Sequence, residues 1–406
     1  MQAYWCYYFV LPMKIVKSIE VMLRCFLWKG PSLELSGAKV ACDFVARTKE
    51  EGGLGIKHVS DWNKAAMARH VWDLCNSSFS SIWVDWAHLF LLGSSQFWVA
   101  KVPWNSSWMW RKLLGLRVFL KDHLSFSVGT GSGISLWFDS WLLRGAICSS
   151  IEDRIIYDSG FPSSAGVSDI ICDGEWCPPR AVSAELWEVQ NAIRSLPPPT
   201  GDRDRVLWNG QSDFSIRKVW EELTLKFVEV LWSSLVWNRV APARYSFVLW
   251  LVVLKRLPTQ DRLQRTGLAF PNRCFLCEVD SESFDHLFIL CGWSRQLWFS
   301  FLGLLSVDFP AGSLSDIISW CSCNFIGNSM TCVLGRFGLA ATVYLIWKER
   351  NSRMHGAAPH RGSVTRLNFD LVIQSRFSSC KKYPNNEENL DLITRWNFPI
   401  SFLRNG

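Results

Sequence analysis

The spacing of apolar and polar residues predicts helices over much of the chain. In residues 14–28, apolar side chains recur every three or four positions, with a proline before the run and a glycine after it, which is typical of an amphipathic helix. We expect a second helix over residues 61–75, with Ser60 as its N-cap. Residues 337–354 show the same apolar stripe and predict a packed helix near the C-terminus.

The pattern changes in the middle of the chain. The glycine-rich residues 129–133 predict a turn, and the apolar residues 134–138 after them predict a short strand. Two further short strands, 205–208 and 214–216, flank Asn209-Gly210, a pair that favours a two-residue hairpin turn. We therefore predict an α+β fold that is predominantly α-helical, with several small subdomains and a short β-containing middle section.

These patterns divide the chain into four regions. A length of 406 residues allows two to four domains, and an apolar content of 49% is that of a globular protein. The expected regions are helical 1–115, β-containing 116–228, a helical module 229–305 that holds a metal ion, and helical C-terminal 306–406.

Cysteine usage and hydropathy bear on the compartment. Most of the 14 cysteines stand singly among apolar neighbours, which favours a reducing intracellular compartment, nuclear or cytoplasmic, over a disulfide framework. The first residues lack the basic start and the cleavage site of a signal peptide, so secretion is not expected. The apolar run 245–254 is about half the length that crosses a bilayer, and residues 317–335 are diluted by polar side chains. We predict no membrane-spanning helix and no membrane partner.

One cluster carries the spacing of a metal site. Cys274, Cys277, His286 and Cys291 follow the pattern C-x2-C-x8-H-x4-C. Three sulfur ligands and one imidazole in a tetrahedral set favour zinc over calcium or magnesium. Four protein ligands leave no position for water, so we predict one structural zinc ion. The alternative is three buried cysteines beside a surface histidine.

The last two ligands constrain the local backbone. His286 and Cys291 are five positions apart, and a regular helix would point them roughly 140° away from each other. We therefore expect the helix to break between them, with a new helix over residues 293–298.

A basic stretch precedes the cluster. Residues 231–273 contain one carboxylate, Asp261, and carry a local net charge of +6, against +7 for the whole chain. Their basic residues are Arg239, Arg244, Lys255, Arg256, Arg262, Arg265 and Arg273. With the interleaved aromatic residues Trp237, Tyr245, Phe247 and Trp250 they are candidates for phosphate contacts and base stacking. In the alternative, the aromatic side chains pack inward and the basic face is only solvated; the two can coexist.

These residues resemble a known family. Residues 237–242 (Trp-Asn-Arg-Val-Ala-Pro), 257–259 (Leu-Pro-Thr), 261–263 (Asp-Arg-Leu) and the Cys-Cys-His-Cys set are similar to the zinc-binding domain that follows reverse transcriptase in plant non-LTR (LINE-type) retrotransposons. The likeness extends on both sides and so covers most of the chain; the further segments that carry it are 11–12, 26–28, 50–56, 61–63, 129–131 and 137–141. It implies that 229–305 are this zinc-binding domain. It also implies that 1–115 are a remnant of the polymerase thumb with the following connector, and that the palm is missing.

Catalytic residues are not evident. Polymerases of this class hold two magnesium ions on paired aspartates, and this sequence contains no Asp-Asp pair. Few acids follow Ser363, so a ribonuclease H site is not expected either. Asp139 lies between Trp137 and Trp141 without a second carboxylate beside it, which favours a structural role.

The sequence therefore predicts a non-catalytic, retroelement-derived zinc-binding protein that associates with RNA or DNA and takes no small-molecule substrate. Two alternatives remain open at this point. The zinc-stapled module could instead bind another protein, with a basic face that only keeps it soluble. The chain could also be an accessory fragment of a reverse transcriptase whose palm is supplied by a polymerase partner in trans.

Overall fold

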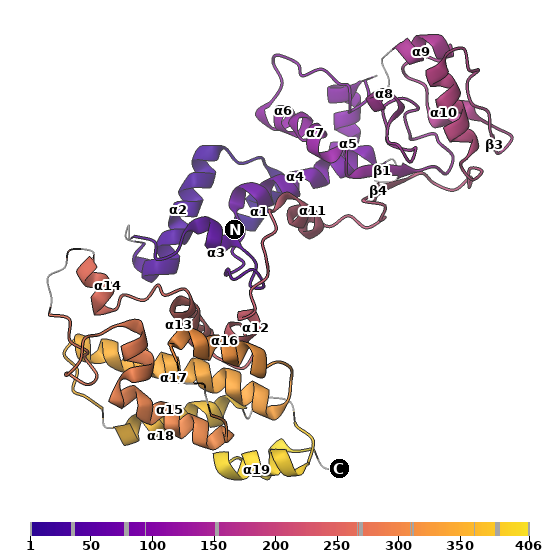
Figure 1. The fold of residues 1–406 in the computed structure, drawn as a ribbon. Helices are drawn as coiled ribbons and strands as arrows, with labels where there is room; N and C mark the ends of the chain where they lie inside the picture. The colour runs from indigo at the N-terminus through magenta and orange to yellow at the C-terminus, as the bar shows by residue number, and fades with distance from the viewer. Residues whose placement is uncertain are drawn as a thin grey trace. The chain divides into compact units, whose positions relative to one another are not determined.

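The computed structural model describes residues 2–404, except for 34–36, 77–80, 94, 151–153, 266, 268–270, 309, 311, 361 and 378–381. The chain forms two compact units. Unit 1 comprises Met1–Leu33 and Lys57–Lys226, and unit 2 comprises Glu34–Ile56 and Phe227–Gly406. Helices dominate and strands are short (Figure 1), which confirms the predominantly helical α+β class. The four regions expected from sequence stay predictions.

Unit 1 is built around the helix α4 Val59–Cys75, whose small residues Ala65 and Ala66 are fully buried and let its neighbours approach closely. The other helices of the unit are α1 Gln2–Tyr8, α2 Met13–Lys29, η1 Gly30–Ser32, α5 Ile82–Trp86, η2 Ala87–Leu92, α6 Trp108–Gly115, α7 Arg117–Leu120, α8 Ile147–Ser150, α9 Arg154–Ser159, η3 Val167–Ile170, α10 Ala184–Arg194 and α11 Ile216–Leu223. Helices α2 and α4 confirm the first two predicted helices. His58, not Ser60, is the N-cap of α4.

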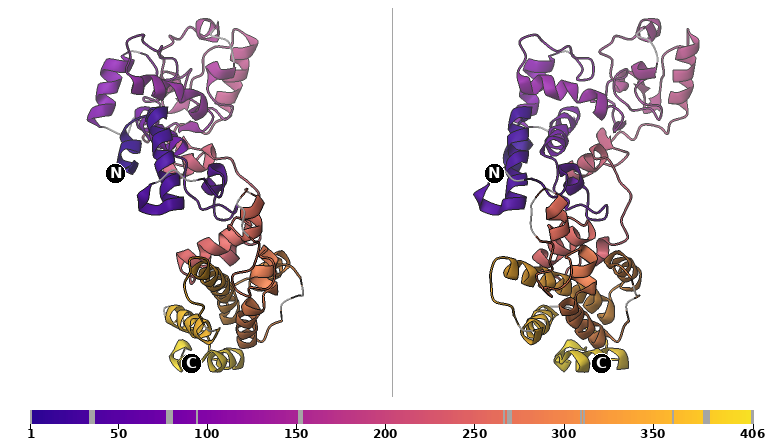
Figure 2. Two further views of the ribbon diagram at one scale, coloured as in Figure 1. Left: turned by 90° about the vertical axis from the view of Figure 1, so that its left-hand side faces the viewer. Right: turned by 60° about the vertical axis from the view of Figure 1, so that its left-hand side comes forward.

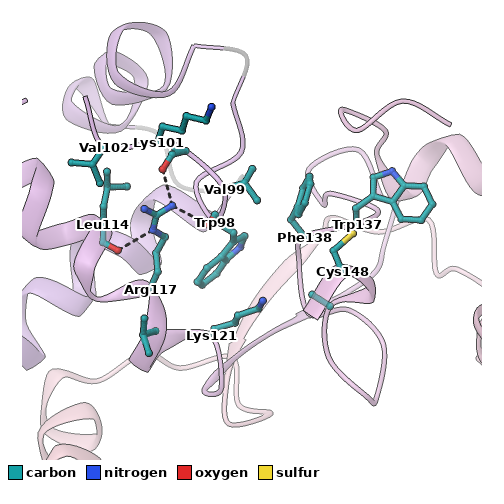
Figure 3. Close-up of a pocket in the computed structure, with 13 residues that line it drawn as sticks. Trp98, Val99, Lys101, Val102, Leu114, Arg117, Lys121, Trp137, Phe138 and Cys148 are labelled. Carbon is teal, nitrogen blue, oxygen red and sulfur yellow. Dashed lines mark hydrogen bonds between the residues drawn. The ribbon is translucent and has the colours of Figure 1, made fainter. Parts of the chain in front are cut away.

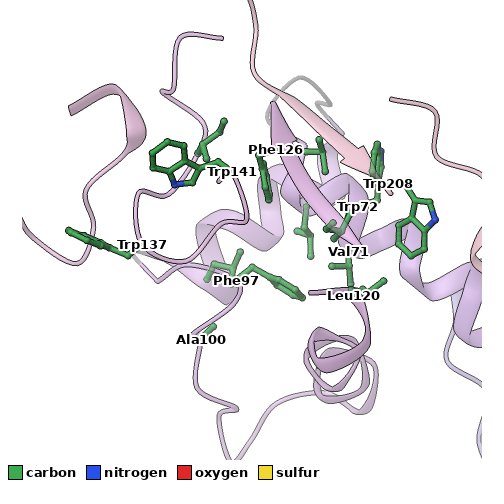
Figure 4. Packing of buried hydrophobic residues seen from close by; sticks show 14 of the residues in the cluster. Val71, Trp72, Phe97, Ala100, Leu120, Phe126, Trp137, Trp141 and Trp208 are labelled. Atoms are coloured by element: carbon green, nitrogen blue, oxygen red, sulfur yellow. The ribbon is translucent and has the colours of Figure 1, made fainter. Parts of the chain in front are cut away.

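Two small antiparallel sheets complete unit 1. Strand β1 Leu124–Ser127 pairs with β4 Arg205–Trp208, and β2 Ile171–Cys172 pairs with β3 Glu175–Trp176. The predicted strand at 205–208 is therefore present. A continuous apolar core fills the space between α4, the first sheet and the loops beyond it, and Figure 4 shows Val71, Trp72 and Trp208 in this core.

The strand predicted over residues 134–138 is wrong. The structure holds one isolated bridge there, from Ser135 to Gly166, and the strand of this region lies before the glycine-rich turn. Ser135 N–H donates to the Asp139 carboxylate at 2.6 Å, and this bond curls the backbone into a turn. Leu136 and Trp137 are both fully buried, so burial does not alternate as it does in a half-buried strand.

The hairpin predicted around Asn209-Gly210 is half correct. Both residues have positive φ, +45° and +77°, and the backbones of Trp208 and Gln211 bond to each other across the turn. Residues 214–216 form no strand, because Ile216 begins α11 and shares its buried face with Val219 and Trp220. Strand β4 pairs instead with β1, about 80 residues earlier in the chain.

The glycine-rich turn encloses a buried carboxylate. Gly129 and Gly131 donate their backbone N–H groups to Asp204 Oδ1 at 2.8 Å, and Gly133 donates to Oδ2 at 2.9 Å. A Cβ at Gly129 would lie 2.2 Å from the carbonyl oxygen of Asp202, so the close approach requires glycine. These amides thus serve an anion of the chain itself.

Unit 2 is built around the long helix α17 Met330–Met354, which contacts α13, α15 and α18 directly (Figure 1). The turned views in Figure 2 show the orange and yellow helices of this unit packed together. The other helices are α3 Cys42–Ala46, α12 Ser233–Val236, α13 Ala243–Val253, α14 Gln260–Arg265, η4 His286–Leu290, α15 Gly292–Leu305, α16 Leu314–Asn324, α18 Gly362–Phe377, α19 Glu387–Trp396 and η5 Ile400–Phe402.

Helix α17 confirms the predicted helix over 337–354 and begins earlier, at Met330, where the Ser329 hydroxyl caps it. Among the described residues it is the one helix long and apolar enough to cross a bilayer by composition. However, 83% of its apolar window is buried inside unit 2. Its apolar surface is therefore used to form a protein core.

Candidate metal centre

The first two ligands lie on a tight turn. Cys274 N–H donates to the Asp280 carbonyl oxygen and Glu278 N–H donates to the Cys274 carbonyl oxygen, both at 2.8 Å. These bonds close residues 274–280 into a loop that we call the knuckle. Leu276 N–H points at the Cys274 sulfur at 3.4 Å. Such N–H groups stabilise a thiolate, and the turn directs both cysteine side chains to the same side.

The other two ligands lie at a wide helical turn. Cys291 N–H donates to the His286 carbonyl oxygen, five residues back, at 2.7 Å. This π-type turn, η4, has more residues per turn than an α-helix and so brings residues five apart nearer to one face. Cys291 itself is extended, and α15 starts at Gly292. The predicted break and the new helix are both present, and the wide turn was not foreseen.

The four predicted ligands converge. One ligand atom from each of Cys274, Cys277, His286 and Cys291 lies within 4.8 Å of all the others. A tetrahedral zinc site with bonds of about 2.3 Å places its sulfur atoms about 3.8 Å apart, so a small contraction would complete the coordination. Cys274 and Cys291 are fully buried. This set of four residues can hold one zinc ion, which confirms the predicted cofactor.

The electrostatics of the sulfur atoms suit a metal ion. The pKa of Cys291 is lowered to about 5, chiefly by a hydrogen bond from the Cys274 thiol and also by the backbone N–H groups of Ser294 and Trp293, which together outweigh the effect of burial. The same hydrogen bond with Cys291, together with burial, raises the pKa of Cys274. The pair thus shares one proton, which a divalent cation would displace.

The histidine has a defined orientation. His286 Nε2 faces the Cys277 sulfur at 3.3 Å, and its Nδ1 lies 3.8 Å from the Asp280 carboxylate. Nε2 is therefore the ring nitrogen placed to bind the metal, while Nδ1 faces the Asp280 carboxylate. A carboxylate behind a ligating histidine is a common way to fix its orientation.

A buried ion pair that no sequence pattern indicated joins the site to α17. Glu282 lies between the second and third ligands, and Arg350 lies on α17; both side chains are 0% exposed. Arg350 Nη2 donates to Glu282 Oε1 at 2.7 Å, and Gln260 N–H donates to the same oxygen at 2.9 Å. One turn later, Arg353 donates to the Leu276 carbonyl oxygen at 2.9 Å. The end of α17 therefore supports the knuckle directly.

The basic candidates lie mostly on the surface. Arg262 is half-buried, and the exposed members are Arg239, Arg244, Lys255, Arg256, Arg265 and Arg273. Of the four aromatic candidates for base stacking, Tyr245 and Trp250 face inward, while Trp237 and Phe247 are half-buried. Trp250 is buried with its Nε1 bonded to the Gly52 carbonyl oxygen at 2.7 Å, and Tyr245 is buried. These two rings cannot stack on a base, whereas the basic side chains can reach a phosphate.

Asp139 has the structural role expected of it. Its carboxylate accepts hydrogen bonds from Ser135 N–H and Trp98 Nε1–H, both at 2.6 Å, and the residue is buried. Burial raises its pKa to about 6, although both hydrogen bonds act to lower it. No nucleophile or base is needed to explain these contacts.

The raised pKa of Asp139 predicts a pH dependence of stability. Because the folded pKa exceeds the unfolded value of about 3.9, the folded state binds the proton more tightly, and this contribution is lost as the pH rises through 6. From about pH 5 to 7.5, the unfolding free energy of the wild type should fall by about 1.4 kcal/mol relative to Asp139→Asn. Chemical denaturation at both pH values measures this, with exposed Asp122→Asn as control. If the unfolding free energies of the wild type and Asp139→Asn differ by the same amount at both pH values, the prediction is contradicted.

Two comparisons bear on the site. Residues 214–298, which include all four ligands, match the family model described as zinc-binding in reverse transcriptase. The chain is also 25% identical over 309 residues to an Arabidopsis thaliana protein named "Putative ribonuclease H protein", an alignment that covers 71% of this chain and 48% of the relative. The chain thus spans about half the length of that relative. The predicted resemblance to a reverse transcriptase zinc-binding domain is confirmed.

Proposed function

We propose that this chain is a non-catalytic part of a plant non-LTR (LINE-type) retroelement protein, in which a structural zinc ion holds a basic surface ready to contact nucleic acid. The observation that carries the proposal is the convergence of four soft ligands within 4.8 Å, directly after a stretch of net charge +6. The match of residues 214–298 to a zinc-binding family of reverse transcriptases supports the same assignment.

The geometry favours contacts with the phosphate backbone over base recognition. Two of the four stacking candidates, Tyr245 and Trp250, are buried, whereas six of the seven basic residues are exposed, so this surface offers mainly positive charge. Lys255 and Arg256 follow the end of α13, both exposed, and Arg256 N–H is fixed by the Leu251 carbonyl oxygen at 2.7 Å. A rigid turn that carries two adjacent cations can bind phosphates with little loss of entropy. Such contacts carry no sequence information and are sensitive to salt.

The absence of catalysis is part of the proposal. It is supported by the absence of an Asp-Asp pair from the sequence and by the four-ligand zinc set, which leaves no open position for water. The name of the Arabidopsis relative concerns that protein, about half of which aligns with this chain. The zinc-loaded chain should show no activity in primer extension or in cleavage of an RNA–DNA hybrid. Metal-dependent turnover in either assay contradicts the proposed absence of catalysis.

Charge reversal at the surface tests nucleic-acid binding. In the zinc-loaded full chain, Lys255→Glu with Arg256→Glu should weaken binding to labelled RNA or DNA at least tenfold. The salt slope, d log K/d log[salt], should become shallower by about 0.7–0.9 for each phosphate that the variant no longer binds. Fluorescence anisotropy at several salt concentrations measures both quantities.

The matched control is Arg180→Glu with Arg194→Glu, which makes the same change of net charge at exposed positions in unit 1. Zinc content should be unchanged in both double variants. If the Lys255 and Arg256 variant binds as the wild type does, with an unchanged salt slope, the basic face is only solvated. A protein-interaction role would then be the better description.

A further inference from the structure

Unit 1 contains a pocket of about 520 Å³ that is remote in sequence from the zinc ligands. Its walls come from residues 98–102, from α6 and α7, and from the turn around Trp137 and Phe138 (Figure 3). The volume lies within the range of small-ligand sites. Nothing in the zinc centre or in the proposed function uses it.

The pocket is positively charged. Lys101, Arg117 and Lys121 line it, and none of its 13 lining residues is acidic. The segment 101–121, which supplies six of the 13 lining residues, contains five basic residues and no Asp or Glu. A concave surface lined by one sign of charge concentrates ligands of the opposite sign, so the ligand should be an anion.

The aromatic wall is held in place. Trp98 lies between Arg117 and Phe138 in the view of Figure 3, and its Nε1 is fixed by the buried Asp139 carboxylate at 2.6 Å. Arg117 donates to the carbonyl oxygens of Phe97, Trp98 and Ala100 at 2.9–3.0 Å, which fixes the backbone that carries the indole. A half-buried indole with a fixed ring plane suits stacking on a flat ligand.

A second tryptophan stands exposed beside the rim. Trp104 is 92% exposed, two positions after the lining residue Val102, which is itself exposed. A fully solvated indole contributes nothing to the core. Together with Lys101 it presents a ring and a cation three positions apart in sequence, a combination typical of surfaces that follow a nucleic-acid strand.

We propose that this pocket and its rim bind a single-stranded segment of RNA or DNA. Unpaired bases stack on Trp98 and Trp104, and the phosphates pair with Lys101 and Lys121. A duplex is excluded because its base faces are already stacked inside the helix. The site is independent of the zinc centre, so it can stand even if the basic surface of unit 2 binds nothing.

Removal of the exposed ring tests the proposal. In the zinc-loaded full chain, Trp104→Ala should weaken binding of fluorescein-labelled oligo(dT) and oligo(U), each of about 12 nucleotides, by about tenfold at low salt. Anisotropy titrations measure this. The matched control is Trp187→Ala on α10, also an exposed tryptophan (60%) in unit 1 but flanked by Glu185 and Glu188. The control should bind as the wild type does.

The same assay tests the contribution of the two lysines and the type of nucleic acid that is bound. Lys101→Glu with Lys121→Glu should weaken binding at least tenfold and make the salt slope shallower by about 1.4 if two single-strand phosphates are contacted. Both effects should persist in the Lys255→Glu, Arg256→Glu background, which separates this site from the proposed function. If the variants lose affinity for oligo(dT) alone, the site binds DNA; if they lose affinity for oligo(U) alone, it binds RNA. Unchanged binding of both oligonucleotides in both variants, or a blunt duplex of the same length binding equally well, overturns the proposal.

Discussion

Replacing Cys291 with serine should release the zinc ion and unfold the core of unit 2 around it. Cys291 ends η4 and caps α15, so its sulfur fixes the junction of two helices as well as one corner of the site. Serine is a poor zinc ligand, and the three remaining ligands would leave buried thiols without their cation. We expect one zinc per chain in the wild type and none in the variant, measured by atomic absorption, with loss of the corresponding transition in thermal melts followed by circular dichroism.

The size of this effect follows from the linkage between metal binding and folding. Structural zinc sites contribute about 10–16 kcal/mol of apparent binding free energy, which is comparable with the whole stability of a domain, about 5–15 kcal/mol. Cys323→Ser is the matched control, because Cys323 is an exposed cysteine of the same unit. A strong chelator should convert the wild type to the behaviour of the Cys291 variant. If the melt of the wild type ignores the chelator, the ion has no structural role.

The metal ligands could be predicted from sequence because their chemistry is local. Four ligand residues fall within 18 positions, and their spacing alone was enough to identify them. The same local reasoning failed at residues 134–138, where a short apolar run directly after a glycine-rich turn resembles a strand. A hydrogen bond from Ser135 to Asp139, four residues ahead, bends that backbone instead. The pattern of apolar residues shows which segments can be buried. It does not show that one side chain will accept a hydrogen bond from a nearby backbone N–H group.

The support of the knuckle could not be predicted, because it is not local. Glu282 and Arg350 are 68 positions apart, and neither stands in a pattern that marks it. In sequence, Arg350 belongs to an ordinary polar end of an apolar helix. Its burial depends on α17 passing behind the zinc loop, which is a property of the tertiary fold. The sequence therefore identified the site and missed the residues that hold it in unit 2.

Breaking this ion pair should produce the second large effect. Arg350→Met removes the cation and leaves the Glu282 carboxylate fully buried with Gln260 N–H as a remaining donor. An uncompensated buried charge costs about 3–5 kcal/mol. Because zinc binding and folding are coupled, the apparent zinc affinity should fall by about a hundredfold or more. Competition with a chromophoric chelator measures the affinity, and chemical denaturation measures the stability.

The double variant Glu282→Gln with Arg350→Met separates the burial of charge from the effect of altered packing. With the carboxylate neutralised, the desolvation cost disappears, so the double variant should be more stable than Arg350→Met alone and should recover most of the zinc affinity. Lys348→Met, at an exposed position on the same helix, should change neither quantity. If Arg350→Met keeps the wild-type affinity for zinc, the ion pair with Glu282 does not support the zinc centre. If the affinity falls as expected, the zinc centre and α17 form one cooperative unit, and a fragment that ends before α17 would bind zinc more weakly than the full chain.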